Sequence, residues 1–409
     1  MNVSLKTIAV AVWVILALVG ILGIFERLVN GHHSANYGSY VVWGLWVSAY
    51  IYFAGISAGA FLFSCTIRLA KIKKLESLGT IALFVALVAL VMGLFSIWVD
   101  LGAMTRAHYV LISPSFSSVM AWMIWLYTTY SVVLAISLWL ALRAGLARQG
   151  RLQGFRGWLG RTASLSKQEL TPAQEENASR WLRMLSIFGI PLAISFCGGV
   201  GALFGSVAAR SYWHTPLIPI LFLFGALVSG GGLLMFVYAA IWKNRDEKYV
   251  GTLKFLGCVV VGLLLFDLML EFAEFSIPMW YGIGSEYALM TEILFGHFWW
   301  VFWIVHIVVG SAIPIFLILI FGDKPWANAL AGFLIATMFL AVRLNIVIPG
   351  LIEPSLKLLE DAFIDRRLRF EYLPSFFEWQ VLTFIVALGI ALFYLGYRNL
   401  PLAEGRKAS

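Results

Sequence analysis

Three carboxylates within an otherwise apolar segment are the first residues of this sequence that could do chemistry. The stretch FDLMLEFAEF holds Asp267, Glu271 and Glu274 at spacings of four and three, which places them on one face of a helix. About 24 Å of helix separates Gly251 from Asp267, so the acids lie inside the apolar layer of a membrane. Ionisable groups at such a depth are costly and mark functional sites.

Arg343 is the natural partner of these acids, because it lies at a similar depth in a later apolar segment. Opposite charges in hydrocarbon are expected to pair, so we predict that Arg343 pairs with Asp267 or Glu271. The sequence leaves two interpretations open: an ion pair that only locks two helices together, or a proton path along the acidic face.

A second set of polar residues occurs in VDLGAMTRAHYVLISPSFSSVMAW. Asp100 ends one apolar segment, Arg106 and His108 follow in a short loop, and Ser117 and Trp122 open the next segment. An acid and an imidazole can accept the two protons that a quinol releases on oxidation. We therefore expect Asp100 and His108 to be catalytic, with Arg106 tuning the acid.

The remaining residues of this predicted pocket would hold a quinone ring. Tyr50 lies about 15 Å along the preceding apolar segment from the same side, and it is expected to line the pocket together with Ser117 and Trp122. Each of these residues could also be purely structural, and their convergence on one side favours the functional interpretation.

The composition identifies the elements that carry these residues as membrane-spanning helices. Of the 409 residues, 61% are hydrophobic and 12% are charged, which is typical of a polytopic membrane protein. A span requires about 20 apolar residues and must be helical to satisfy its backbone in lipid. We predict ten spans, near residues 7–25, 40–67, 77–99, 118–142, 184–206, 216–242, 250–274, 298–321, 327–349 and 376–397.

An internal likeness suggests that eight of these spans form two parallel repeats. FAGISAGAFLF in the second span aligns with FGALVSGGGLLMF in the sixth, and the same offset places Asp100 one position from Glu271. We predict two four-helix bundles with flanking first and last helices, divided as residues 1–39, 40–210, 211–350 and 351–409.

Basic residues set the predicted orientation. Of the 29 Lys and Arg residues, 21 lie in the tails and loops on the side of the N-terminus and 7 on the opposite side, with Arg343 inside a span. The positive-inside rule then makes both termini cytoplasmic, in a prokaryotic cytoplasmic membrane. The net charge of +8 reflects this topology and does not indicate nucleic-acid binding.

Cofactor ligands are sparse. Cys65, Cys197 and Cys258 are isolated within apolar segments, so we expect neither an iron–sulfur cluster nor a metal site in this chain. Of the six histidines, His306 alone lies well inside a predicted span, whereas a bis-histidine haem needs two. Bound haem is not expected.

The sequence resembles the NrfD/polysulfide reductase membrane-subunit family. The likeness lies in WGLWVSAYIYFAGISAGAF, DLGAMTRAHYVLISPSFSSVMAW and ARSYWHTPLIPILFLFGALVSGGG, and in VRLNIVIPGL and EYLPSFFEWQ toward the C-terminus. These last two stretches look like the ten-helix branch that includes DsrP, HybB and ActC. In this resemblance the family's acid maps onto Asp100 and its bundle-lining aromatic position onto Tyr50.

The resemblance implies a quinone-reactive membrane anchor of a respiratory oxidoreductase, without a redox cofactor of its own. It would exchange electrons between menaquinol or menaquinone and a ferredoxin-like iron–sulfur subunit on the outer face. A further catalytic subunit, carrying molybdopterin, a hydrogenase centre or several haems, would complete the complex. The alternatives are a proton-coupled secondary transporter and a purely structural anchor. The sequence does not identify the terminal substrate or the direction of electron flow.

Overall fold

Ten long helices build the molecule, as seen in a computed structural model that describes residues 5–72, 75–166, 169–242, 245–354, 356, 358–359, 362–363, 365 and 367–402. No strand occurs among these residues. The helices that could span a membrane are α1 (Leu5–Asn30), α2 (Leu45–Leu69), α3 (Glu76–Asp100), α5 (Val119–Gln149), α7 (Pro172–Gly205), α8 (Leu217–Ile241), α9 (Glu247–Tyr281), η3 (Val301–Ala312) continued by α11 (Ile313–Phe321), α12 (Pro325–Val347) and α14 (Phe376–Asn399). The ten-span prediction is therefore confirmed.

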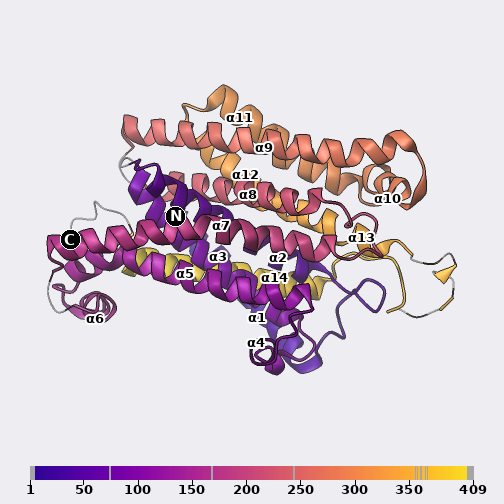
Figure 1. Cartoon of the computed structure of the whole chain (residues 1–409), viewed down its shortest axis with the longest axis horizontal. Helices are drawn as coiled ribbons and strands as arrows, with labels where there is room; N and C mark the ends of the chain where they lie inside the picture. Colours follow the sequence, from indigo (N-terminus) through magenta and orange to yellow (C-terminus); the bar gives the residue numbers. More distant parts are fainter. Residues whose placement is uncertain are drawn as a thin grey trace.

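Shorter elements lie at the two ends of the bundle, where α6 shares one end with the start of α1 and the end of α14 (Figure 1). The opposite end carries α10 and α13 (Figure 1); we call it the outer end, because it is the side that carries fewer basic residues. The short elements are η2 (Met104–Arg106), α4 (Tyr109–Ile112), α6 (Gly154–Ala163), α10 (Gly284–Phe295) and α13 (Pro349–Ile352). The sequence did not predict them.

Two predicted spans differ from the observed helices in instructive ways. The predicted span 184–206 is the apolar part of a longer helix, because Thr171 and Gln174 form a capping box that begins α7 at Pro172. The predicted span 298–321 is one helix with two hydrogen-bonding patterns. Its first half, η3, is a π-helix of 12 residues, a length that is rare because π-helices usually occur as single turns.

Helix α2 forms the centre of the molecule. It packs against α3, α7, α8 and α12. Helix α1 packs against α14, and α9 with α11 lies along one edge of the molecule (Figure 1). Small residues make the α2–α8 contact possible: a Cβ atom at Gly230 would lie 2.7 Å from the Ala60 nitrogen. The grouping of α3, α5 and α7 around α2, and of α9, η3 and α12 around α8, is compatible with two bundles. Their equivalence as repeats stays a prediction.

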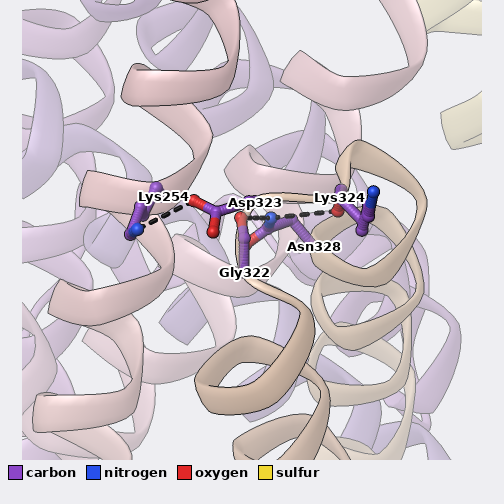
Figure 2. Close-up of polar contacts among 5 residues, drawn as sticks. All are labelled: Lys254, Gly322, Asp323, Lys324 and Asn328. Atoms are coloured by element: carbon purple, nitrogen blue, oxygen red, sulfur yellow. Dashed lines mark hydrogen bonds and ion pairs between the residues drawn. The ribbon is translucent and has the colours of Figure 1, made fainter.

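The inner end of α9 is tied to the turn between α11 and α12 (Figure 2). Lys254 forms an ion pair with Asp323 at 2.7 Å. The Asn328 amide donates to the carbonyl oxygens of Gly322, at 2.7 Å, and Lys324, at 3.3 Å. These contacts hold together the turn between α11 and α12, which lies at the end of the molecule opposite to α10.

Replacement of Gly230 by Ala tests the α2–α8 contact. The added methyl group meets backbone atoms of Ala60 and Gly59 that cannot rotate away, so we expect a loss of about 1–3 kcal/mol in unfolding free energy. Gly262→Ala is the matched control, since a Cβ at Gly262 on α9 meets nothing within 4 Å. Reversible unfolding in detergent micelles measures both, and equal stability of the two variants would reject a tight crossing.

Candidate functional site

Asp100 lies at the outer end of α3, where Arg27 of α1 covers the helix terminus. The Arg27 guanidinium donates from Nε to the Val99 carbonyl at 2.6 Å and from Nη2 to the Leu101 carbonyl at 2.8 Å. A cation is favourable at this end, because the helix dipole leaves the carbonyls partly negative. One carboxylate oxygen of Asp100, Oδ1, is buried and has no hydrogen-bond partner. Arg27 therefore caps the end of α3 beside an acid that retains an open acceptor position.

A histidine and a tyrosine extend this arrangement. Arg27 Nη2 lies 2.9 Å from His32 Nε2. Because guanidinium can only donate, Nε2 must accept and Nδ1 must carry the ring proton. Nδ1–H then donates to the Tyr37 hydroxyl, whose own proton is within reach of the Asp100 carboxylate. Burial, and then the charge of Arg27, lowers the pKa of His32, so the neutral tautomer fits its surroundings.

Glu378, at the start of α14, holds the loop that carries His32 and Tyr37. Its Oε2 accepts from the backbone nitrogens of Asn36 at 3.1 Å and Ser375 at 2.9 Å, and its Oε1 accepts from the Tyr372 hydroxyl. Glu378 is completely buried. Burial, followed by the nearby carboxylates of Asp100 and Glu378, raises the pKa of Tyr37, so this hydroxyl remains a proton donor. Asp100 and Glu378 therefore both lie near Tyr37.

The other members of the predicted pocket lie elsewhere. The side chains of Arg106, His108, Ser117 and Trp122 are exposed. Ser117 Oγ lies 2.9 Å from Ser115 Oγ, and Trp122 Nε1 donates to the Phe116 carbonyl at 2.8 Å. The described side chains thus do not form the closed pocket that the sequence suggested, because the segment from Met104 to Ser118 turns outward in short helices. Any role of these four residues stays a prediction.

Tyr50 is buried within the first group of helices. Its ring stacks on Tyr127 of α5 at 5.9 Å, and Tyr127 in turn meets Phe196 of α7 at 4.5 Å. The Tyr127 hydroxyl is buried without a hydrogen-bond partner. A second open polar position therefore lies among aromatic rings between α2, α5 and α7.

The acidic face of α9 borders a small cavity of about 20 Å³, which is sufficient for one water molecule. Asp267, Glu271 and Glu274 line it together with Arg343 of α12 and Tyr212. Arg343 is buried and donates to the Phe222 carbonyl at 3.3 Å, and its guanidinium lies 4.6 Å from the Phe222 ring centroid. The structure brings the four predicted residues together, but among the described residues Arg343 forms no direct ion pair with an acid.

His306 completes this second cluster and was missed as a site residue by the sequence analysis. Its Nε2 lies 3.5 Å from Glu271 Oε2, and both residues are largely shielded. His306 belongs to η3, whose wider turn places the imidazole between Phe302 and Phe339. The sequence does show a lone histidine within an apolar span, but the sequence analysis considered it only as a possible haem ligand.

Arg27, Tyr37 and Glu378 were also missed. Arg27 was counted only as a loop charge, and Glu378 lies far from Asp100 in the sequence. A capping-box pattern at Ser375–Glu378 was visible, but it predicts a helix start and not a long-range anchor. In the part of the chain that the structure describes, no three His, Cys, Asp or Glu side chains are grouped as metal ligands.

Comparison with known proteins shows a family match. The family model described as polysulphide reductase, NrfD, matches residues 33–355. A selenate reductase subunit from Mesobacillus selenatarsenatis is 34% identical over 98% of this chain and 96% of its own length. The Hdr-like menaquinol oxidoreductase integral membrane subunit of Archaeoglobus fulgidus is 25% identical over 97% and 94%. The menaquinone reductase integral membrane subunit of Nitratidesulfovibrio vulgaris is 21% identical over 94% and 88%.

The Arg27–His32–Tyr37 chain predicts a pH dependence. The pKa of His32 is lower in the folded state than its ordinary value of about 6.5, so the unfolded state binds more protons below that pH and stability falls as pH drops from 7 to 5. Hydrogen exchange of residues 31–44, corrected for intrinsic rates, should report faster opening at pH 5. In His32→Gln the pH dependence should flatten, whereas His33→Gln, at an exposed neighbour, should retain it. An unchanged slope in His32→Gln would contradict the assignment.

Proposed function

The chain belongs to the polysulphide reductase NrfD family of multi-pass membrane proteins, and on this premise we propose that it is the quinone-reactive membrane subunit of a respiratory oxidoreductase complex. Three relatives carry names that point to such complexes, namely those of selenate reductase, menaquinol oxidoreductase and menaquinone reductase. The proposed substrate is menaquinol or menaquinone, and the proposed site lies near the outer end of α2 and α3.

The observation that carries this proposal is the buried, unpartnered Oδ1 of Asp100. Oxidation of a quinol at its hydroxyl groups releases two electrons and two protons, and a carboxylate within hydrogen-bond reach can accept one proton as the electrons leave. Arg27 stabilises the ionised form of Asp100 before this transfer. His108, although exposed, stays the second candidate for proton acceptor.

A route for the accepted proton is also at hand. Tyr37 lies beside Asp100 and is linked to His32, which is partly exposed in the loop that follows α1. In the resting tautomer His32 Nδ1 donates to Tyr37, so a proton leaving Asp100 can move outward along these two side chains only once Nδ1 is free to accept it. We propose that this change of tautomer accompanies quinol oxidation and that the proton is then released at the outer face without crossing the bilayer.

The quinone ring would lie against the aromatic side chains of α2 and α5. Tyr50 offers a ring face, and the open Tyr127 hydroxyl could donate to a quinone oxygen. Trp122 is 57% exposed, and Phe116 and Trp125 are exposed beside it. In a membrane these rings face lipid, so a lipid-soluble substrate could approach α5 along them.

Electrons would leave through partner subunits, because the substrate must react close to a redox centre. We propose a ferredoxin-like iron–sulfur subunit on the outer face and a catalytic subunit behind it. The outer end exposes large apolar side chains, including Trp280 and Tyr281 at the end of α9, Ile283, and Phe295 of α10. An exposed apolar patch of this kind marks a protein interface or a membrane boundary. We also propose the segment 351–374 as the polar rim of this docking surface, because it is the largest connection on this side and mixes charges of both signs; it lies partly outside the described residues.

The rival function is that of a proton-coupled transporter, which the acids of α9 also permit. A purely structural anchor is the third possibility. Copurification distinguishes the redox subunit from the transporter, since a redox complex retains iron–sulfur and catalytic subunits, and a transporter is stable alone.

The cytoplasmic placement of both termini is part of the proposed function and follows from the distribution of basic residues.

Asp100→Asn tests the proton acceptor. The amide nearly preserves the volume but cannot take up the proton, so quinol-linked turnover of the assembled complex should fall by about two to four decades. Asp323→Asn is the control, because Asp323 is an exposed carboxylate at the opposite end of the molecule, paired with Lys254 (Figure 2). Turnover of Asp100→Asn at the level of this control would remove Asp100 from the mechanism.

Site-specific crosslinking tests the placement of the partner. A photoreactive residue at exposed position 281 or 295 should capture the iron–sulfur subunit in the native membrane, and one at exposed position 155 of α6 should not. Capture from position 155 alone would place the iron–sulfur subunit at the opposite end of the molecule, and it would contradict the proposed orientation in the membrane.

A further inference from the structure

We propose that the cavity between α9, η3 and α12 is a second site, separate from the quinone site, that binds an exchangeable proton and opens to the outer face only. The site consists of Asp267, Glu271, Glu274, His306 and Arg343, and we call it the α9 cluster. It does not depend on the quinone function proposed above, because its groups belong to the other set of helices.

The first argument is unsatisfied hydrogen bonding. Asp267 Oδ1 is buried without a hydrogen-bond partner, and Glu271 Oε2 and His306 Nε2 are buried with only each other nearby, at 3.5 Å and without a hydrogen bond. A structural ion pair would place its charges in direct contact, because an unpaired buried charge is costly. Here the guanidinium of Arg343 instead uses a backbone oxygen and an aromatic ring of α8. The cluster is thus arranged around an open space that can hold about one water molecule.

The second argument is charge balance. Three carboxylates share the cavity with one guanidinium, and Asp267 and Arg343 are each only 2% exposed. Two uncompensated negative charges in such a space would carry a large desolvation penalty. Binding of one proton removes one of these charges, and binding of a second removes the other. A proton on Asp267 or Glu271, with His306 able to accept it from Glu271 at 3.5 Å, lowers the charge by one and supplies a hydrogen-bond donor among the orphaned atoms.

The groups that face the cluster from the surrounding elements support this assignment. Helix α8 contributes the Phe222 carbonyl and ring, and α7 contributes the Cys197 thiol near Arg343. The segment before α8 contributes Tyr212. None of these groups adds a cation, so Arg343 supplies the fixed positive charge.

The third argument concerns direction. Glu274 is the outermost acid and accepts from Thr215 Oγ1 at 3.4 Å, and beyond it lie Glu286 of α10, which is exposed, and Glu353. Toward the inner end, α9 presents the apolar run CVVVGLLLF. The charged residue before this run, Lys254, is engaged by Asp323 in the turn shown in Figure 2. Protons therefore have polar neighbours on the outer side and an apolar barrier on the inner side.

The state of the carboxyl groups can be read directly by infrared spectroscopy. The purified complex in lipid nanodiscs, without turnover, should absorb at neutral pH where protonated carboxylic acids absorb, and this band should shift in D2O. Glu271→Gln and Asp267→Asn should each weaken the band, while Asp323→Asn, the exposed control, should leave it unchanged. A band that is absent, or that none of the α9 substitutions weakens, would overturn the proposal. The wild-type D2O shift is decisive if a variant fails to assemble.

Sidedness is tested in oriented proteoliposomes. A rapid pH change on the outer side should change the intensity of the band, and Glu274→Gln should slow this response by about 100-fold, since a relay group is lost. A response only to a pH change on the inner side would overturn the outward opening. These measurements need no quinone, so they remain interpretable if Asp100 is not the quinol base. Turnover that persists in Glu271→Gln would further separate the two sites.

Discussion

The close crossing of α2 and α8 is the contact on which the rest of the architecture depends. At Gly59 and Gly230 the two backbones approach so closely that no side chain fits between them. Association of helices in lipid relies on packing, since lipid tails are as apolar as the side chains they would replace. Glycine provides that packing, and it makes α2 the helix around which α3, α7, α8 and α12 assemble. Both polar clusters lie on helices that contact this central pair.

Polar chemistry is then concentrated on the outer half of the molecule. The Asp100 network joins α1, α3, α14 and the loop after α1, while the α9 cluster joins α9, η3 and α12. Each cluster combines one buried guanidinium with buried acids. The two sites proposed above for proton handling therefore lie toward the same end of the part of the molecule that the structure describes.

The sequence predicted the fold well and the site only in part, for physical reasons. Apolar runs of membrane length are local signals, so all ten spans could be found. The grouping of Asp267, Glu271, Glu274 and Arg343 followed from helical spacing and depth. The partners of Asp100 could not be predicted in this way, because hydrogen bonds such as that from Asn36 to Glu378 join residues 342 positions apart. The outward turn of Arg106 and His108 depends on short helices in the outer loop with no periodic signal.

Glu378 has a consequence for the biogenesis of the protein. It belongs to the last helix, yet it fixes the loop that precedes the second helix, and Tyr372 bonds the Leu45 nitrogen at the start of α2. At typical synthesis rates, roughly tens of seconds separate translation of the two segments. The hydrogen-bond network around Asp100 is therefore incomplete until the last helix has been inserted. A chain that lacks this helix would leave the loop after α1 without its anchor, so the surface near Asp100 takes its final form only after the last span is in place.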